Sequence, residues 1–456
     1  MDTTYKRQSN ILRQALYNAL NVMSPGQVVH NSVQCARNKE IVRVSISNSN
    51  SHSHSTTDFA VRSDANIWVF GTGKAAPRMA VALEEILGDS IKDGIVISHD
   101  ISQTQTNIVQ QFKGDHPLPT SESIAATYEL VELAQKTRPG DLVLFCVTGG
   151  SSALLALPGG DLGLEDLRQT HHLLLNSGAG IHEINTVRKH LSAVKGGQLL
   201  PYFQGCQLLN LIISDVPGDN PAFIGSGSTV FDDTTYKDAQ AILTERGIWG
   251  DLSSHVQNHI LAGIKGMKPE TVKADDSSYV NPSTFLLGTA RKLADTVAKN
   301  LEEQQINTWI LEESYDEPIG AISKRISRDA ISVLKQDRPV KKPAALIYYG
   351  ESMVHVTGSG LGGRNQHMAL SMALSIEGQH HISLLSVGTD GRDGPTDSAG
   401  ALVNASTILT ARENGLDPEA YLKNDDSYHF FEKTGDHIKM GATGNNLMDL
   451  QVVLVE

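Results

Sequence analysis

Short apolar runs, each followed by glycine and then by a helical pattern, recur in the first part of the chain. In ANIWVFGTGKAAPRMAVALEEIL the apolar run predicts a strand over 66–70, and the spacing after GTGKAA predicts a helix. The segments DLVLFCVTGGSSALLALP (141–158) and LLNLIISDVPGD (208–219) repeat the strand and the glycine turn. These strands are apolar throughout, which is typical of a parallel sheet covered on both faces. The repeated units predict right-handed crossovers and a doubly wound α/β sheet.

A polar segment with two prolines, KGMKPETVKADDSSYVNPST, interrupts this pattern over 265–284 and predicts a domain crossing. Beyond it, GTARKLADTVAKNLEEQ predicts a helix, and NTWILEESY predicts a strand. AALIYYG, MVHVTG, HISLLSV and LQVVLVE predict further strands. We therefore expect a Rossmann-like, doubly wound, three-layer domain over 1–280 and a smaller α/β domain with a mixed sheet over 281–456.

The composition is that of a globular protein, with 456 residues, 40% hydrophobic and 20% charged. The net charge of −13 argues against a general binder of nucleic acid or of a membrane surface, although a few local cations suffice for a small anionic substrate. Cys35, Cys146 and Cys206 form no C-x-x-C pair and indicate buried thiols in a reducing cytoplasm. The polar, amphipathic N-terminal segment is unlike a secretory signal, and no apolar run approaches the length of about 18 residues that spans a membrane.

Polar loops at strand ends are the candidate sites, because open α/β sheets bind ligands at the carboxyl ends of their strands. In GTGKAA, glycines let backbone N–H groups approach an anion, and Lys74 adds a positive charge. The other interpretation of Lys74 is a solvent-exposed lysine at a helix start. VTGGSSALLALP resembles a second phosphate or carboxylate cradle, and it lacks the G-x-S-x-G elbow of a hydrolase nucleophile.

Two further segments before the predicted crossing carry charge. INTVRKHLSAVKGGQLL clusters Arg188, Lys189 and Lys195, and the spacing of seven positions from Arg188 to Lys195 corresponds to two turns along one helical face. This cluster is either an anion site or a solvated helix face. In LIISDVPGDN, Asp215 and Asp219 emerge from an apolar strand, which is typical of Mg²⁺ ligands, of a general base or of an ordinary Asp-rich turn.

A glycine-rich loop, VTGSGLGGRNQH, precedes Arg364, whose guanidinium can hold a phosphate or carboxylate through two hydrogen bonds. The same loop matches G-x-G-x-x-G through Gly358, Gly360 and Gly363, which is a weak indication of a dinucleotide site.

Three aspartates lie in the flexible stretch GTDGRDGPTDSAGA, directly after the apolar run ISLLSV. Asp390 and Asp393 are candidates for coordinating Mg²⁺ or for orienting basic residues. Asp397 could equally cap a helix beginning near Ser398. The chain as a whole offers glycine cradles, cations and strand-end aspartates, and no motif for a covalent nucleophile, zinc or flavin. Phosphoryl transfer fits this inventory best, since it relies on positioning and electrostatics.

Eight motifs occur in order: GTGKAA, GDHPLP, TGGSSALL, NTVRKHLSAVKGG, ISDVPGD, GSGLGGRNQ, GTDGRDGPTDSAGA and GATGNNLMDL. Together they resemble the glycerate 2-kinase family with a MOFRL C-terminal domain, once often labelled hydroxypyruvate reductase. The resemblance implies ATP- and Mg²⁺-dependent phosphorylation of D-glycerate to 2-phosphoglycerate, in a cleft between two α/β domains. Three positions depart from the family pattern: TGGSSALL stands for SGGGSALL, GSGST at 225–229 stands for ASGPT, and His367 follows RNQ where Glu is common.

The resemblance also implies that Lys74 and Arg364 match the basic residues that the family places in this cleft. From this and from the loops described above we expect the following roles. Lys74 and Arg364 would neutralise the triphosphate and the transferred group, and one of them would also grip the glycerate carboxylate. Asp215 would accept the proton of the 2-hydroxyl or bind Mg²⁺, with Asp390 and Asp393 as metal ligands. The remaining expected substrate- or nucleotide-binding residues are Gly71, Gly73, Thr148, Gly149, Gly150, Ser151, Ser152, Arg188, Lys195, Asp219, Gly362, Gly363, Asn365, Thr443 and Asn445.

Two alternatives remain open at this point: an NAD(P)H-dependent hydroxypyruvate reductase and a non-catalytic nucleotide-binding protein. The reductase would need a dinucleotide fingerprint in an early βα turn, which GTGKAA does not supply. We expect no nucleic-acid or membrane partner, and the sequence leaves the oligomeric state open, a homodimer included.

Overall fold

The computed structural model describes residues 3–50, 53–102, 104–279 and 281–456, and the chain divides into two compact units. Pro25–Leu287 forms one unit, which we call the central unit. Met1–Ser24 and Gly288–Glu456 together form the other, which we call the terminal unit. This division differs from the expected domains at the N-terminus, because helix α1 (Thr3–Val22) packs on elements of the terminal unit.

The central unit is built on a six-stranded sheet with the order β6-β5-β4-β7-β8-β9, and neighbours from β6 to β8 run parallel. Strands β4 and β7 are buried along their whole length, as their uninterrupted apolar sequences predict. The expected doubly wound α/β fold is confirmed. The elements, in chain order, are α2 (Pro25–Ser32), β1 (Val33–Arg37), β2 (Ile41–Asn50), β3 (Ser53–Arg62), β4 (Ile67–Thr72), α3 (Ala76–Leu87), β5 (Ile91–Ser98), β6 (Val109–Lys113), α4 (Ser121–Ala134), β7 (Leu142–Val147), α5 (Ser151–Leu154), α6 (Leu164–Asn176), α7 (Ile181–His190), β8 (Gln207–Ile213), α8 (Tyr236–Glu245), α9 (Ser254–Ile264) and β9 (Ser283–Gly288).

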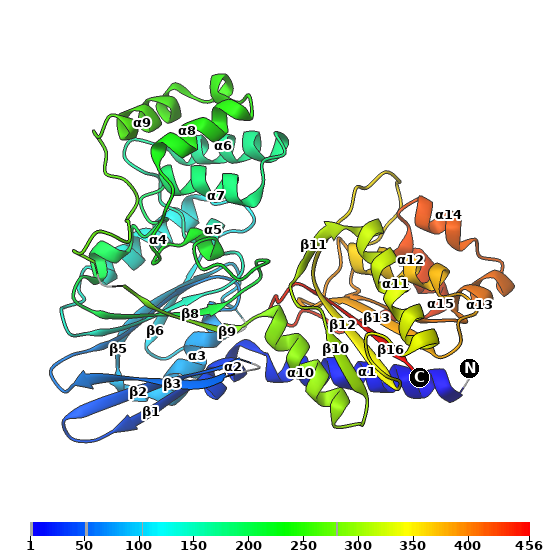
Figure 1. The fold of residues 1–456 in the computed structure, drawn as a ribbon. Coiled ribbons are helices and arrows are strands. Elements are labelled where there is room, and N and C mark those ends of the chain that lie inside the picture. The colour runs from blue at the N-terminus through cyan, green and yellow to red at the C-terminus, as the bar shows by residue number, and fades with distance from the viewer. Residues whose placement is uncertain (1–2, 51–52, 103, 280) are drawn as a thin grey trace. The chain divides into compact units, whose positions relative to one another are not determined.

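Helices α6 to α9 gather into a cluster on the same side of the parallel sheet as α4 and α5, while the small antiparallel sheet β1–β3 lies on the opposite side with α2 and α3 (Figure 1). The helical cluster has a hydrophobic core of its own, which includes Leu174, Val187, Leu243 and Ile260. We call this cluster the cap.

The terminal unit contains a seven-stranded mixed sheet with the order β10-β12-β16-β13-β14-β15, in which β11 also pairs with β12. Strands β10 and β11 run parallel to β12, and the other pairs are antiparallel, so the expected mixed sheet is confirmed. Helices α11 and α12 cover one face of the sheet, and α1 and α10 cover the other (Figure 1). The elements after α1 are α10 (Ala290–Glu302), β10 (Asn307–Ile310), β11 (Tyr315–Pro318), α11 (Ile319–Gln336), β12 (Ala344–Met353), α12 (Arg364–Ser375), β13 (Ile382–Gly388), β14 (Gly400–Asn404), α13 (Thr407–Glu413), α14 (Pro418–Lys423), α15 (Ser427–Thr434), β15 (His437–Ile438) and β16 (Asp449–Val455).

Three sequence-based expectations about local structure are wrong. MVHVTG is no separate strand, because β12 ends at Met353 and an irregular segment leads to α12. Arg188 and Lys195 do not share a helical face, because α7 ends at His190. No helix begins near Ser398, where the chain instead enters β14, so Asp397 caps none and accepts hydrogen bonds from Tyr428 and Lys439. Among the described helices, none has the length and apolar character that a membrane crossing needs.

Candidate functional site

In the central unit, the loops after β4 and β7 are joined to each other at the carboxyl ends of the strands. The backbone N–H of Lys74 donates to the carbonyl of Gly149 at 2.9 Å, and that of Ala75 donates to Oγ1 of Thr148 at 3.0 Å. Gly73 has φ +122, and a Cβ there would lie 2.1 Å from Oγ1 of Thr148, so only glycine allows this approach. The side chain of Lys74 is exposed.

Three ionisable side chains surround the Gly149–Gly150 turn. A Cβ at Gly149 would lie 2.2 Å from Oδ2 of Asp215, which follows β8. A Cβ at Gly150 would lie 3.1 Å from Cδ2 of His116 and 3.4 Å from Cγ of Lys74. Burial and then the charge of Lys74 lower the pKa of His116 to about 4, so this imidazole is neutral at pH 7. The structure thus brings the predicted Lys74 and Asp215 to one turn.

The hydroxyl groups of this region serve mainly to hold the loops. Oγ of Ser151 donates to the carbonyl of Thr72 at 2.8 Å, and Oγ of Ser152 pairs with Oγ of Ser226 at 2.9 Å. Gly71 is the place of closest approach between β4 and β7, since a Cβ there would lie 2.8 Å from Cβ of Cys146. Asp219 lies in the loop after β8, with φ +52. The contacts of Ser151 and Ser152 therefore hold the loop that contains the Gly149–Gly150 turn.

The basic segment that follows α6 is not a solvated helix face. Lys195 is 5% exposed in the segment after α7, and Arg188 is half-buried on α7; both line one small cavity. Lys189 is also buried, and its Nζ forms an ion pair with Oδ1 of Asp232 at 2.9 Å.

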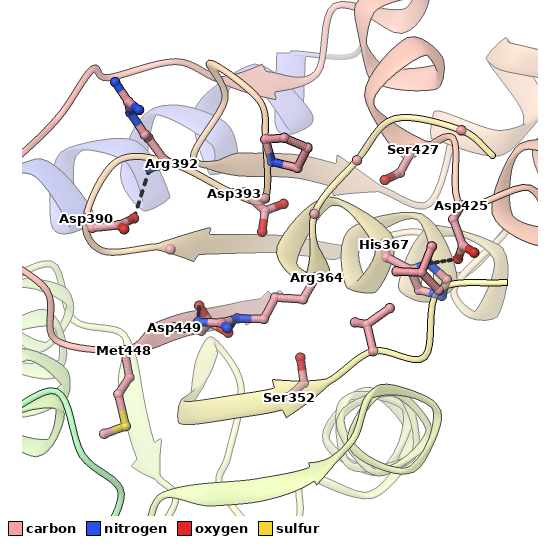
Figure 2. Close-up of a pocket in the computed structure, with 18 of the residues that line it drawn as sticks. Ser352, Arg364, His367, Asp390, Arg392, Asp393, Asp425, Ser427, Met448 and Asp449 are labelled. Atoms are coloured by element: carbon pink, nitrogen blue, oxygen red, sulfur yellow. Dashed lines mark hydrogen bonds and ion pairs between the residues drawn. The ribbon is translucent and has the colours of Figure 1, made fainter. Parts of the chain in front are cut away.

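In the terminal unit, Arg364 begins α12 and lines a pocket of about 610 Å³ (Figure 2). Its guanidinium donates to Asp449 through Nε at 2.5 Å and through Nη2 at 3.1 Å, and Nη2 also donates to Oε1 of Glu351 at 2.7 Å. Burial lowers the pKa of Arg364, but the ion pairs with Asp449 and Glu351 outweigh it and raise that pKa above its ordinary value. The side chain remains 36% exposed toward the pocket.

Asp393 occupies the N-terminus of α12. Its Oδ1 accepts from the backbone N–H and the side-chain amide of Asn365, and its Oδ2 accepts from the same two groups of Gln366, at distances of 2.8–3.3 Å. The side chain is 2% exposed. A carboxylate has about four acceptor positions, and all four are used here, which disfavours the expected role of Asp393 as a metal ligand.

Asp390 lines the pocket and is half-buried, and its Oδ1 accepts from the backbone N–H of Arg392 at 3.0 Å (Figure 2). Within the described ranges no group of three or more His, Cys, Asp or Glu side chains could hold a metal ion. Mg²⁺ commonly needs only one or two carboxylates when substrate phosphates and waters complete its shell. The residues therefore fit a metal that arrives with a phosphate ligand, held by Asp390.

The remaining candidates of the terminal unit form hydrogen bonds within that unit. Nδ2 of Asn365 donates to Oδ1 of Asp449 at 2.9 Å, and Nδ2 of Asn445 donates to the carbonyl of Met23 at 2.7 Å. Oγ1 of Thr443 donates to the carbonyl of Thr389 at 2.8 Å.

The glycines of VTGSGLGGRNQH serve chain packing. Cβ atoms at Gly358, Gly360 and Gly362 would clash with the segment Asn424–Ser427, at distances of 2.1–2.4 Å. A Cβ at Gly363 would lie 2.3 Å from Cγ of Asp393. Since Asp393 takes the N–H groups at the start of α12, this loop offers no helix N-terminus to a pyrophosphate.

Sequence reasoning missed several residues of these clusters. His116 lies inside the quoted motif GDHPLP and Asp449 inside GATGNNLMDL, yet neither was selected. Glu351 follows the predicted strand AALIYYG directly, and a charged residue at a strand end is the signal that could have found it. His367 lines the same pocket, with Nδ1 at 3.4 Å from Oδ1 of Asp425.

The fold and these clusters define a class of protein. It is an α/β protein with two units, and each unit places cations and carboxylates at a glycine-rich loop. The chain matches a domain of unknown function, DUF4147, over residues 11–261, and the MOFRL family over residues 344–449. It is 40% identical over 384 residues to the D-glycerate 2-kinase of Thermotoga maritima, covering 84% of this chain and 89% of that one. The chain belongs to the glycerate 2-kinase family with a MOFRL domain, as its motifs led us to expect.

A solved structure of glycerate kinase from Thermotoga maritima superimposes with a TM-score of 0.85 at 34% identity, covering 99% of this chain and 100% of that one. A protein of Agrobacterium vitis named putative hydroxypyruvate reductase is 36% identical over 389 residues, covering 85% of this chain and 86% of that one.

Proposed function

We propose that the protein transfers the γ-phosphoryl group of ATP to the 2-hydroxyl of D-glycerate and releases 2-phosphoglycerate and ADP. The names of the Thermotoga relative and of the superimposed structure support the reaction class. The observation that carries the proposal is the cluster at the Gly149–Gly150 turn. There the exposed ammonium of Lys74 and the carboxylate of Asp215 lie on either side of two glycines. Phosphoryl transfer needs this combination of open backbone, positive charge and a proton acceptor.

Lys74 stabilises the charge of the transferred phosphoryl group in this proposal. Its side chain is exposed, and its backbone is fixed by the hydrogen bond to Gly149, so the ammonium projects from a rigid base. Asp215 accepts the proton of the 2-hydroxyl as the oxygen attacks phosphorus. The neutral imidazole of His116 adds no positive charge that would compete with Lys74 for the phosphate.

Arg364 supplies the second cation of the proposal. Asp449 and Glu351 hold its guanidinium in one orientation, and the exposed part of the side chain faces the pocket. A guanidinium fixed in this way binds phosphate or carboxylate oxygens with little further loss of conformational freedom. Asp390 would hold Mg²⁺ there together with phosphate oxygens, and the ion would supply charge neutralisation when bound.

The reductase alternative keeps the support of the Agrobacterium relative's name. The packing of Gly358, Gly360 and Gly363 argues against it. These glycines contact other segments of the same chain, so the G-x-G-x-x-G match offers no open loop for a dinucleotide. We therefore place phosphoryl transfer first.

The direct test is a coupled assay with D-glycerate, ATP and Mg²⁺ in which enzymes specific for 2-phosphoglycerate and 3-phosphoglycerate distinguish the product. We expect ADP and 2-phosphoglycerate in equal amounts. A parallel incubation with hydroxypyruvate and NADH or NADPH should leave the nucleotide absorbance unchanged. Formation of 3-phosphoglycerate alone would move the transfer to the other hydroxyl, and oxidation of the nicotinamide without ADP release would replace the kinase by the reductase.

A further inference from the structure

A small cavity beside the cap is lined by hydrogen-bond donors and apolar side chains. It has a volume of about 40 Å³ and lies between α6, α7 and the segments 152–157 and 191–195. His171, Arg188, Lys195 and Ser152 contribute its polar wall. Since a cavity of about 10–15 Å³ suffices for one water molecule, the space fits one small group and excludes a triphosphate.

Among the residues that the structure describes, the two cations of this cavity have no countercharge. Within the described residues neither Arg188 nor Lys195 forms an ion pair with Asp or Glu, whereas the neighbouring Lys189 pairs with Asp232. Burial and then repulsion by Arg188 lower the pKa of Lys195 to about 7, and burial lowers the pKa of Arg188 to about 10. Buried charges in proteins are normally paired, because an unpaired charge loses its hydration without compensation.

Some of the donor groups that line the cavity have no acceptor among the described residues. Nζ of Lys195 donates to the carbonyls of Ser152 at 2.9 Å and Leu155 at 2.6 Å, so two of the three ammonium protons are used by the described residues. Nη2 of Arg188 lies 2.9 Å from Nε2 of His171. Arginine only donates, so Nε2 is the acceptor and the proton of the neutral ring is on Nδ1. That Nδ1 is buried and has no partner among the described residues.

We propose that this cavity binds the carboxylate of a small 2-hydroxy acid, and that the acid is the substrate glycerate, so the assignment rests on the proposed function. A carboxylate supplies the missing negative charge, accepts from both cations and has the size of the cavity. Ser152 lies in the same loop as Gly149 and Gly150, which connects the cavity along the chain to the turn with Lys74 and Asp215. Arg188 and Lys195 would therefore select acids over uncharged polyols.

The binding test uses the full-length protein without nucleotide. Isothermal titration with D-glycerate should give a dissociation constant that weakens about tenfold or more in Lys195→Met and in Arg188→Gln, as expected for the loss of a charged hydrogen bond. Glycerol, which lacks the carboxylate, should not bind. Lys237→Met, which removes an exposed cation on α8, is the matched control and should bind D-glycerate like the wild type.

Folding is checked by circular dichroism, and Arg188→Gln keeps the test valid if Lys195→Met unfolds, because Arg188 is only half-buried. Unchanged D-glycerate affinity in a folded variant overturns the proposal. A second outcome also overturns the proposal: chloride raises the midpoint of thermal unfolding of the wild type but not of Lys195→Met, and D-glycerate raises neither. The cavity would then bind an inorganic anion.

Kinetics separates this inference from the proposed function. The KM for D-glycerate should rise about tenfold or more in both variants, while the KM for ATP stays constant. Phosphorylation of D-glycerate with an unchanged KM in both variants would overturn the inference and leave the kinase intact. Binding of D-glycerate that depends on Lys195, without any phosphorylation, would overturn the kinase and leave the anion site intact.

Discussion

Lys74 has a backbone that is held by a hydrogen bond and a side chain that is exposed to solvent. Its N–H is fixed to Gly149, and its ammonium is exposed beside the open turn. We expect Lys74→Met to lower kcat by about 10²–10³-fold, because a positive charge positioned on the transition state is lost. The midpoint of thermal unfolding should not change, since no buried contact is removed. Lys92→Met, at the opposite end of the sheet, should leave kcat unchanged. Equal rates in both variants would remove Lys74 from the site.

The lowered pKa of Lys195 predicts how the stability of the protein depends on pH. Its pKa is about 7 in the folded protein and 10.5 in an ordinary lysine, so between these values the unfolded chain binds the extra proton. Stability therefore rises with pH through this window. The groups that face the ammonium, Arg188 on α7 and His171 on α6, do not offset this between pH 7 and pH 9. Arg188, whose pKa is lowered to about 10, stays largely charged there, and His171, whose pKa is lowered to about 4, stays neutral. Urea unfolding at pH 7 and pH 9 should show the wild type gaining stability relative to Lys195→Met. A constant difference between the two proteins would show that Lys195 keeps its ordinary pKa.

At the scale of elements, helix α12 depends on a carboxylate far away in the sequence. Asp393→Asn should destabilise the protein by about 1–3 kcal/mol, because it removes an acceptor from N–H groups that are buried at the helix start. Asp390→Asn should leave stability unchanged and raise the Mg²⁺ concentration needed for half-maximal activity. Chemical denaturation and Mg²⁺ titration of the two variants check this pair. A raised Mg²⁺ requirement in Asp393→Asn without loss of stability would reverse the two roles.

The elements that could be predicted from the sequence are those whose signal is local. The apolar runs at 67–72 and 142–147 are readable because a strand buried on both faces needs no polar position. The glycine loops were found because close approach requires residues without side chains. In contrast, Asp393 caps a helix that begins before it in sequence, and Lys195 is buried against carbonyls of 152 and 155. No pattern within a short window contains such partners.

At the scale of the whole molecule, the chain does not divide into two consecutive halves. Helix α1 packs in the same unit as residues 288–456. Its amphipathic sequence predicts only that it covers an apolar surface, and does not identify that surface. Polar contacts specify which surface this is. Nε2 of Gln8 donates to Oε2 of Glu456 at 2.9 Å, and Oγ of Ser383 donates to Oε1 of Gln8 at 2.6 Å. The terminal unit therefore combines α1 with the segment 288–456.

This arrangement predicts a selective loss of stability. Leu16 is 1% exposed on α1, and Leu16→Ala should cost about 2–5 kcal/mol through the cavity that it leaves. The loss belongs to the terminal unit, because α1 contacts α10, β13 and β16. Hydrogen exchange should therefore accelerate in β13 and β16 and stay constant in β4 and β7. Gln14→Ala, at an exposed position on the same helix, is the control and should change neither set. Equal acceleration in all four strands would mean that the two units unfold as one, and that α1 stabilises both of them.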